Sequence, residues 1–148
     1  MIMDKNTTFC DALAVDSAAG TTLEGDVIDL GAASLNPGAG QPIYLVVQVT
    51  TAFTSGGSAT VAFVLASDAQ AAIATDGAAT EHYLTEAIPF ASLVVGYKRI
   101  IALPQGVDYE RYLGVLVTTA AATTTAGSIS AFLTWDVQNN RSYPDAVN

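Results

Sequence analysis

Residues 40–51 read GQPIYLVVQVTT, a run of aliphatic and aromatic residues that follows Gly and Pro. A short apolar run closed by turn residues is typical of a β-strand that is buried on both faces. Because side chains alternate along a strand, this stretch presents two faces. The predicted core face holds Ile43, Leu45, Val47 and Val49, and the opposite face holds Tyr44, Val46 and Gln48. We predict that the rest of the chain packs around this strand.

Further short apolar segments, separated by turn residues, lie on both sides of this strand. They predict strands at residues 9–16, 27–30, 60–67, 82–88, 97–103, 111–119 and 128–137. The turn at residues 54–58 predicts that the strands on either side of it form an antiparallel hairpin. Residues 17–22 and the Thr/Ala segment before Gly127 are predicted loops, and residues 68–80 form either one helical turn or a loop. In the last strand Trp135 alternates with inward-facing residues, so we predict that it lies in the core.

About eight short strands without a long helical pattern predict an all-β fold, and a two-sheet antiparallel jelly-roll sandwich accommodates this number. The 148 residues fit a single domain, 1–148. We expect its core at about residues 9–138, between an N-terminal arm and a polar C-terminal arm at residues 139–148.

The composition limits the classes of partner. The chain carries a net charge of −9 and only five Lys and Arg residues, so neither nucleic acid nor an anionic membrane surface is an expected partner. No segment approaches the roughly 18 apolar residues of a membrane span, and the N-terminal MIMDKNTTFC lacks the apolar core of a secretion signal. Charged residues make up only 13%. This low share fits either a surface that other protein covers or simply a small-residue β protein.

Residues suited to catalysis or metal binding are few. His82 is the only histidine, so one chain cannot form a multi-histidine metal site, and no Gly-x-Ser-x-Gly pattern accompanies it. Cys10 is the only cysteine and is expected to be structural. Two acidic groups that could in principle bind calcium lack dedicated loop spacing and are expected to be solvated: Glu24 with Asp26 and Asp29, and Asp108 with Glu110. We therefore expect no enzyme activity, no cofactor and no metal.

The few cations are candidate contacts for an acidic partner surface. Lys98, Arg99 and Arg111 are three of the five positive residues. Tyrosines beside them offer aromatic contact area of the kind found at interfaces. The candidate interface residues are Tyr97, Lys98, Arg99, Arg111, Tyr112 and Tyr143. The alternative is that the cations pair locally with Asp108 and Glu110 and that the tyrosines pack across strands.

The order of several sequence segments resembles a known family, the jelly-roll capsid cement (decoration) proteins of tailed bacteriophages. The central segment at residues 40–61, GQPIYLVVQVTTAFTSGGSATV, is the most similar part, and residues 68–87 are the least similar. The other matching segments are Phe9-Cys10-Asp11-Ala12 with Val15, Val27-Ile28-Asp29-Leu30-Gly31, Gly96-Tyr97, Ile101-Ala102-Leu103-Pro104, Arg111-Tyr112-Leu113, Ser130-Ala131-Phe132-Leu133-Thr134 and Asp136-Val137-Gln138.

The resemblance implies a structural protein that binds the outer surface of an assembled icosahedral phage capsid. Such a protein is made in the host cytoplasm, forms a homo-oligomer (a dimer is favoured), and bridges subunits of the major capsid protein. The alternative is a carbohydrate-binding or adhesive jelly-roll module on a virion or cell surface, which needs an aromatic platform or a calcium-held loop at one end. The predicted core position of Trp135 argues against that alternative. A cupin-type enzyme fails for lack of ligating histidines.

Overall fold

The computed structural model describes residues 4–31 and 36–137, which form a β-sandwich with no α-helix in the described ranges. The predicted C-terminal arm and Tyr143 lie outside the described residues. Two short 3-10 helices, η1 (Lys5–Thr7) and η2 (Phe90–Ser92), accompany the strands. The strands are β1 (Thr8–Ala14), β2 (Gly20–Asp29), β3 (Tyr44–Ser55), β4 (Thr60–Asp68), β5 (Thr80–Leu84), β6 (Ile88–Pro89), β7 (Lys98–Ala102), β8 (Tyr112–Ala120) and β9 (Thr124–Thr134).

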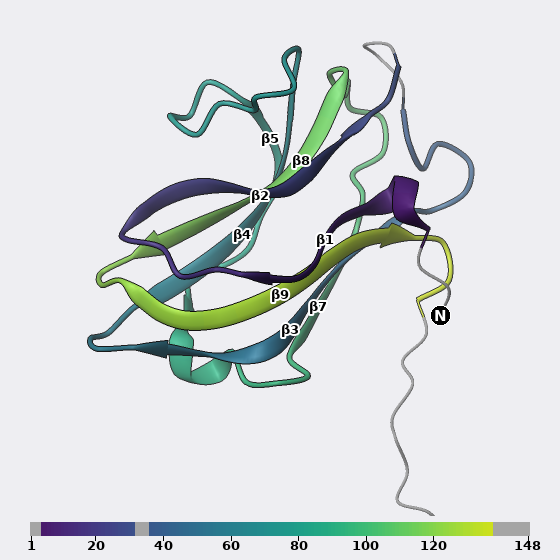
Figure 1. The fold of residues 1–148 in the computed structure, drawn as a ribbon. Helices are drawn as coiled ribbons and strands as arrows, with labels where there is room; N and C mark the ends of the chain where they lie inside the picture. The colour runs from purple at the N-terminus through teal and green to yellow at the C-terminus, as the bar shows by residue number, and fades with distance from the viewer. Residues whose placement is uncertain (1–3, 32–35, 138–148) are drawn as a thin grey trace, which may run out of the picture.

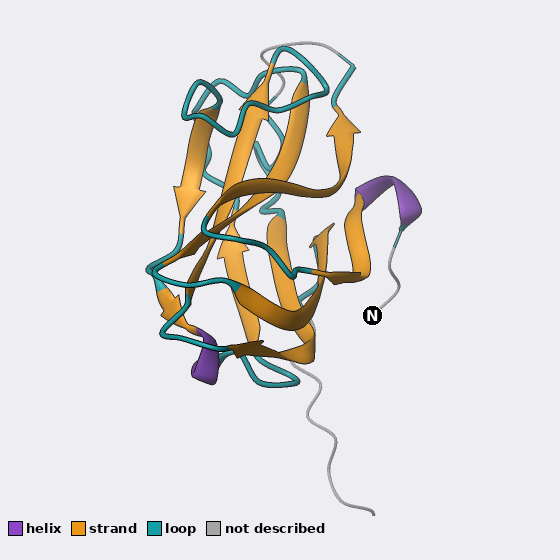
Figure 2. Ribbon diagram, turned by 60° about the vertical axis from the view of Figure 1, so that its left-hand side comes forward, coloured by secondary structure: helices purple, strands orange, loops and turns teal. Residues whose placement is uncertain are grey.

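The strands form two antiparallel sheets that lie one above the other in Figure 1. One sheet has the order β1-β9-β3-β7, and the other has the order β2-β8-β4-β5 with β6 beside β4. The chain passes repeatedly between the sheets, so strands distant in sequence become neighbours. This winding of a four-stranded and a five-stranded antiparallel sheet is a jelly roll and confirms the predicted fold class. The loops gather mainly at the two ends of the sandwich (Figure 2).

The predicted hairpin of β3 and β4 is wrong. β3 pairs with β7 and β9, whereas β4 belongs to the opposite sheet and pairs with β5, β6 and β8. The Gly56-Gly57 turn reverses the chain but carries it across to the other layer. Turn residues indicate a reversal of direction, and the sheet that the next strand enters depends on distant partners.

The main core lies between the two sheets. β3 contributes Leu45, Val47 and Val49, as the alternation of its side chains predicts. Ile43 lies one residue before β3 and packs against this core while only partly buried. The opposite sheet contributes the inward residues of β4 and β8, which are Val61, Phe63, Leu65, Leu113, Val115 and Val117.

A second, smaller apolar cluster covers the outer face of the β2-β8-β4-β5 sheet. The connection between β4 and β5 forms a loop without helix and places Ile73 and Ala79 against Val64 and Leu116. Ile73 fits there because residue 114 is glycine: a Cβ at that position would lie 2.5 Å from the Ile73 Cδ1. The loop therefore acts as a packed cover for this sheet.

β1 and β2 lie at one side of the sandwich and approach each other closely where β2 has a bulge. The register of β2 against β8 shifts between Glu24 and Ile28, and Gly25 has a φ of +76°. A Cβ at Gly25 would lie 2.1 Å from the Phe9 carbonyl oxygen, so only glycine allows the two backbones to approach this closely. Because the bulge interrupts the alternation, the sequence predicted only a short strand at residues 27–30 and a loop at residues 17–22, whereas β2 runs from Gly20 to Asp29.

Two other strand boundaries differ from the prediction. β9 begins at Thr124, inside the predicted Thr/Ala loop, because threonine suits a strand when a neighbouring strand is available to pair with it. The predicted strand at residues 82–88 is divided in two: β5 ends at Leu84, and the two-residue strand β6 (Ile88–Pro89) pairs separately with β4. After β6, η2 and the turn that follows it lead the chain to β7 in the other sheet.

Candidate interaction surfaces

The candidate residues Tyr97, Lys98 and Arg99 lie at the edge strand β7. Tyr97 is partly buried against the main core. Arg99 faces the opposite sheet, where its guanidinium lies 2.8 Å from the Glu86 carboxylate and 3.5 Å from the Tyr83 hydroxyl. Lys98 forms no ion pair with any residue that the structure describes. Within the described part of the chain, no neighbouring carboxylate therefore neutralises the charge of Lys98.

Arg111 and Tyr112 lie at the start of β8, beside the end of β2. The Arg111 guanidinium donates two hydrogen bonds to the Asp29 carboxylate, both at 2.9 Å, and lies 5.0 Å from the centroid of the Tyr112 ring. The hydrogen bond from Arg111 lowers the pKa of Asp29. Since the pair is exposed, it contributes little stability and serves mainly to hold Arg111 in place.

The candidate residues do not form one surface. β7 is an edge of the first sheet and contacts the β5 side of the second, whereas Arg111 lies beside β2 at the opposite edge of the second sheet. Both arginines form an ion pair within the chain, but the predicted local pairing with Asp108 and Glu110 is wrong. Glu86 and Asp29 take the places of Glu110 and Asp108. Glu110 instead accepts a hydrogen bond from Thr80 at 2.7 Å.

His82 belongs to a partly buried polar cluster between β4, β5 and the start of β8. The Glu110 amide donates to the Ser67 hydroxyl oxygen at 3.0 Å, so the Ser67 proton is free to be donated to the His82 Nε2, which is 2.7 Å away. The His82 ring also lies 4.1 Å from the ring of Tyr109, between centroids. Although a serine beside a histidine resembles an activated nucleophile, Ser67 is fully buried, so a substrate cannot reach its hydroxyl.

This cluster makes stability depend on pH. Burial lowers the pKa of His82, so the folded protein binds a proton there less readily than the unfolded chain does. Neutral His82 therefore contributes to the free energy of unfolding at pH values above the pKa of histidine in the unfolded chain, about 6.5. This contribution is lost as the pH falls from that value through the lower pKa of His82 in the folded protein. We expect His82→Gln, which keeps an acceptor for Ser67, to remove this component. Urea unfolding of both proteins at several pH values tests this, and parallel profiles would contradict it.

Three of the acidic residues considered for calcium, Glu24, Asp29 and Glu110, make other contacts. Glu24 is buried and accepts a hydrogen bond from the Thr22 hydroxyl, while Asp29 binds Arg111. Within residues 4–31 and 36–137, no three His, Cys, Asp or Glu side chains are grouped to hold a metal ion. Cys10 is buried, and burial raises the pKa of its thiol to about 11, which keeps it protonated and unreactive. In the same part of the chain, no helix is long and apolar enough to cross a membrane.

Trp135 is exposed, and its predicted core position is wrong. β9 ends at Thr134, and 67% of Trp135 is accessible to solvent. A turn stops the alternation, because the Asp136 amide donates to the Thr134 hydroxyl oxygen at 3.3 Å. The sequence signal that could have indicated the end of the strand is Asp136 directly after Trp135, because aspartate favours turns.

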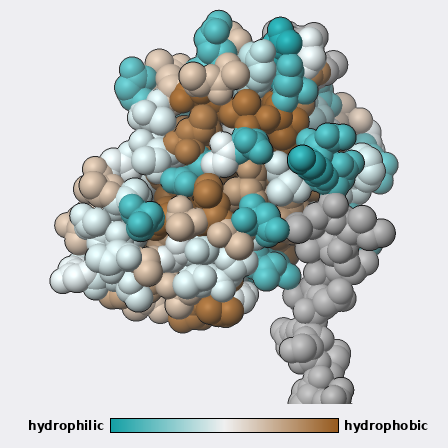
Figure 3. All heavy atoms as spheres, viewed as in Figure 1, coloured by the Kyte–Doolittle hydropathy of each residue, from teal (hydrophilic) through white to brown (hydrophobic). Residues whose placement is uncertain are grey.

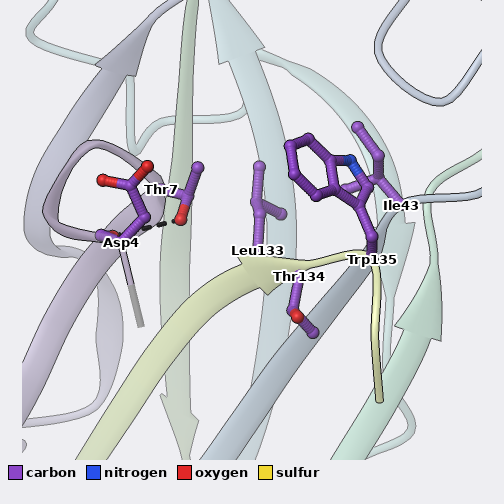
Figure 4. Close-up of a pocket in the computed structure, with 6 residues that line it drawn as sticks. All are labelled: Asp4, Thr7, Ile43, Leu133, Thr134 and Trp135. Atoms are coloured by element: carbon purple, nitrogen blue, oxygen red, sulfur yellow. Dashed lines mark hydrogen bonds between the residues drawn. The ribbon is translucent and has the colours of Figure 1, made fainter. Parts of the chain in front are cut away.

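The exposed indole borders a shallow pocket at one end of the sandwich (Figure 4). Figure 4 shows the Trp135 ring beside Ile43, with Leu133 between these two and the Asp4–Thr7 turn. The Thr7 hydroxyl donates to the Asp4 carbonyl oxygen at 3.1 Å. The pocket therefore combines an aromatic and aliphatic wall with carboxylate and hydroxyl groups. It is lined by Asp4, Thr7, Ile43, Leu133, Thr134 and Trp135.

The face shown in Figure 3 has mixed hydropathy. In Figure 3 many spheres of the lower layer are pale, the colour of intermediate hydropathy, and brown groups are scattered among them. Several large apolar side chains lie exposed around the β5 and β7 edges and the connections beside them. These are Leu84, Val94, Val95, Ile100 and Val107. Such side chains, on a surface with few charges, can be covered by a partner at little desolvation cost.

The fold places the chain among jelly-roll β-sandwich proteins. Its sequence matches the model of the Bbp16 family over residues 9–133. This range contains the whole sandwich except Thr8, the first residue of β1, and Thr134, the last residue of β9. The chain therefore belongs to the Bbp16 family, a domain family of phage or bacterial type. No curated protein matches the chain.

Proposed function

We propose that this protein is a capsid cement protein that binds the outer surface of an assembled icosahedral phage capsid and bridges its major capsid subunits. The observation that carries the proposal is the ordered sequence resemblance to phage cement proteins. The central segment of that resemblance, residues 40–61, spans β3 and the start of β4, which supply the centre of both sheets. Membership of the Bbp16 family and the jelly-roll winding support the same proposal.

The surface chemistry suits such a role. A chain with 13% charged residues and exposed apolar side chains at its edges loses few water contacts when another protein covers it. A homo-oligomer, with a dimer favoured, that touches several capsid subunits would bind by avidity even where each contact is weak. Because it binds the assembled shell and not the separate subunits, it would shift the equilibrium toward the shell.

A binding experiment tests this proposal. We expect the purified protein to be an oligomer by light scattering at micromolar concentration. We also expect it to co-sediment with shells assembled from the major capsid protein of the same genome, but not to associate with the free subunits. A monomer would contradict the bridging mechanism, and shells that sediment without the protein would contradict the function.

The exposed Trp135 favours a second candidate, a carbohydrate-binding or adhesive module. The indole and, on the other side of Leu133, the Asp4 carboxylate and the Thr7 hydroxyl line one pocket, which offers a stacking surface and polar groups for a sugar ring. Trp135 is the only tryptophan, so its fluorescence reports directly on this pocket. A saturable change in fluorescence on titration with glucose, galactose or N-acetylglucosamine, lost in Asp4→Ala, would favour this alternative.

A further inference from the structure

β7 is an edge strand, and among residues 4–31 and 36–137 no strand pairs with the outer side of its backbone. It pairs with β3 on one side only and ends the order of its sheet. The Leu103 amide donates to the Ile43 carbonyl and the Val49 amide to the Tyr97 carbonyl, both at 2.9 Å. In an antiparallel ladder every second residue forms backbone hydrogen bonds with the neighbouring strand. The backbone N–H and C=O groups of Arg99 and Ile101 therefore point toward β3. The backbone N–H and C=O groups of Lys98, Ile100 and Ala102 therefore point away from the sheet.

The other edge strands are less regular than β7. β1 has two register shifts against β9, and Ala12 within it has a φ of 49°. β2 carries the bulge at Gly25, and the pairing of β5 with β4 shifts between Leu65 and Ala66. The pairing of β7 with β3 runs through five residues without a shift. Since bulges protect an edge from pairing with another chain, β7 is the edge best suited to accept an added strand.

The side chains at this edge suit a particular partner. Lys98 and Ile100 share the outer face of the sheet, because Arg99 between them faces the opposite sheet and binds Glu86. Ile100 is 40% exposed and continues a row across the sheet with Val46 and Phe132. Lys98 places a positive charge here on a chain whose net charge is −9. A partner strand with an apolar side chain near Ile100 and a carboxylate near Lys98 would complement this edge.

We propose that the β7 edge binds an extended segment of the major capsid protein as an added strand. This inference rests on the proposed cement function and identifies the binding surface. Main-chain hydrogen bonds to Lys98, Ile100 and Ala102 hold the segment, and its carboxylate pairs with Lys98. A second copy of this chain is the competing occupant. Charge favours the capsid segment, since two copies would bring together two bodies of net charge −9, and β7 (KRIIA) has no carboxylate to pair with Lys98 of a second copy.

A proline substitution tests the edge directly. Ile100→Pro removes an N–H group that points away from β3, so the ladder inside the sheet keeps its hydrogen bonds. Ile100→Val is the matched control, because it keeps the N–H group and an apolar, β-branched side chain. We expect Ile100→Pro to lower the affinity for assembled shells about tenfold or more and Ile100→Val to bind like the wild type. Lys98→Glu, which leaves the backbone unchanged, is expected to weaken binding as well.

Each outcome is informative. If the wild type binds shells and both Ile100→Pro and Lys98→Glu bind equally well, the inference is wrong and the cement function stands. If Ile100→Pro converts an oligomer into a monomer, a second copy occupies the edge and the inference is also wrong. If the wild type itself does not bind shells, the proposed function fails and this inference fails with it. Thermal unfolding of each variant checks that the fold is retained, and Lys98→Glu decides the matter if Ile100→Pro does not fold.

Discussion

Gly25→Ala is expected to destabilise the protein by roughly 2–5 kcal/mol. Overpacking costs roughly 1–3 kcal/mol, and a left-handed backbone at a residue with a Cβ costs roughly 1–2 kcal/mol. Both apply at Gly25, where φ is +76° and the added Cβ would lie 2.1 Å from the Phe9 carbonyl oxygen and 2.7 Å from the Cys10 Cβ. Both of these contacts belong to β1, so relief requires the two strands to separate.

Gly106→Ala is the matched control for this substitution. Gly106 has nearly the same φ, +75°, but a Cβ there would meet no atom within 4 Å. It therefore carries the backbone cost of about 1–2 kcal/mol without the collision. Free energies of unfolding from urea titrations of the wild type and both variants measure the difference. Equal losses in the two variants would show that the close approach of β1 and β2 adds no constraint at this edge.

The parts of the fold that depend on local alternation were predictable from the sequence. The core faces of β3, β4 and β8 follow from a period of two, and the structure places Leu45, Phe63 and Val115 in one core as expected. The placement of β3 and β4 in different sheets was not predictable, because strand order depends on contacts between distant segments. The loop between β4 and β5 was equally ambiguous, since its packing rests on the fit of Ile73 against Gly114 in β8.

The candidate surfaces were only partly predictable. The composition drew attention to Lys98, Arg99 and Arg111 because cations are rare in this chain. It could not show that Arg99 and Arg111 lie at different edges, each bound to a carboxylate brought close by the fold. Trp135 was assigned to the wrong environment because the alternation of β9 was extended past the turn that ends the strand.

A bound cement protein is expected to raise the temperature at which shells break. Binding to the assembled state alone stabilises that state by RT ln(1 + [L]/Kd), which is about 2.7 kcal/mol per site when the free concentration is one hundred times Kd. Because one shell has many binding sites, the stabilisation free energies of the single sites add up over the whole shell. Binding through the β7 edge also predicts that Ile100→Val protects shells as the wild type does, while Ile100→Pro protects them much less.

The most direct test compares the heat resistance of shells with and without this protein. Matured shells of the major capsid protein from the same genome are heated alone and with saturating protein, and their disruption is followed by calorimetry and light scattering. The cement function predicts a higher disruption temperature when the protein is bound. Shells that carry the bound protein and still break at the same temperature as bare shells would contradict it.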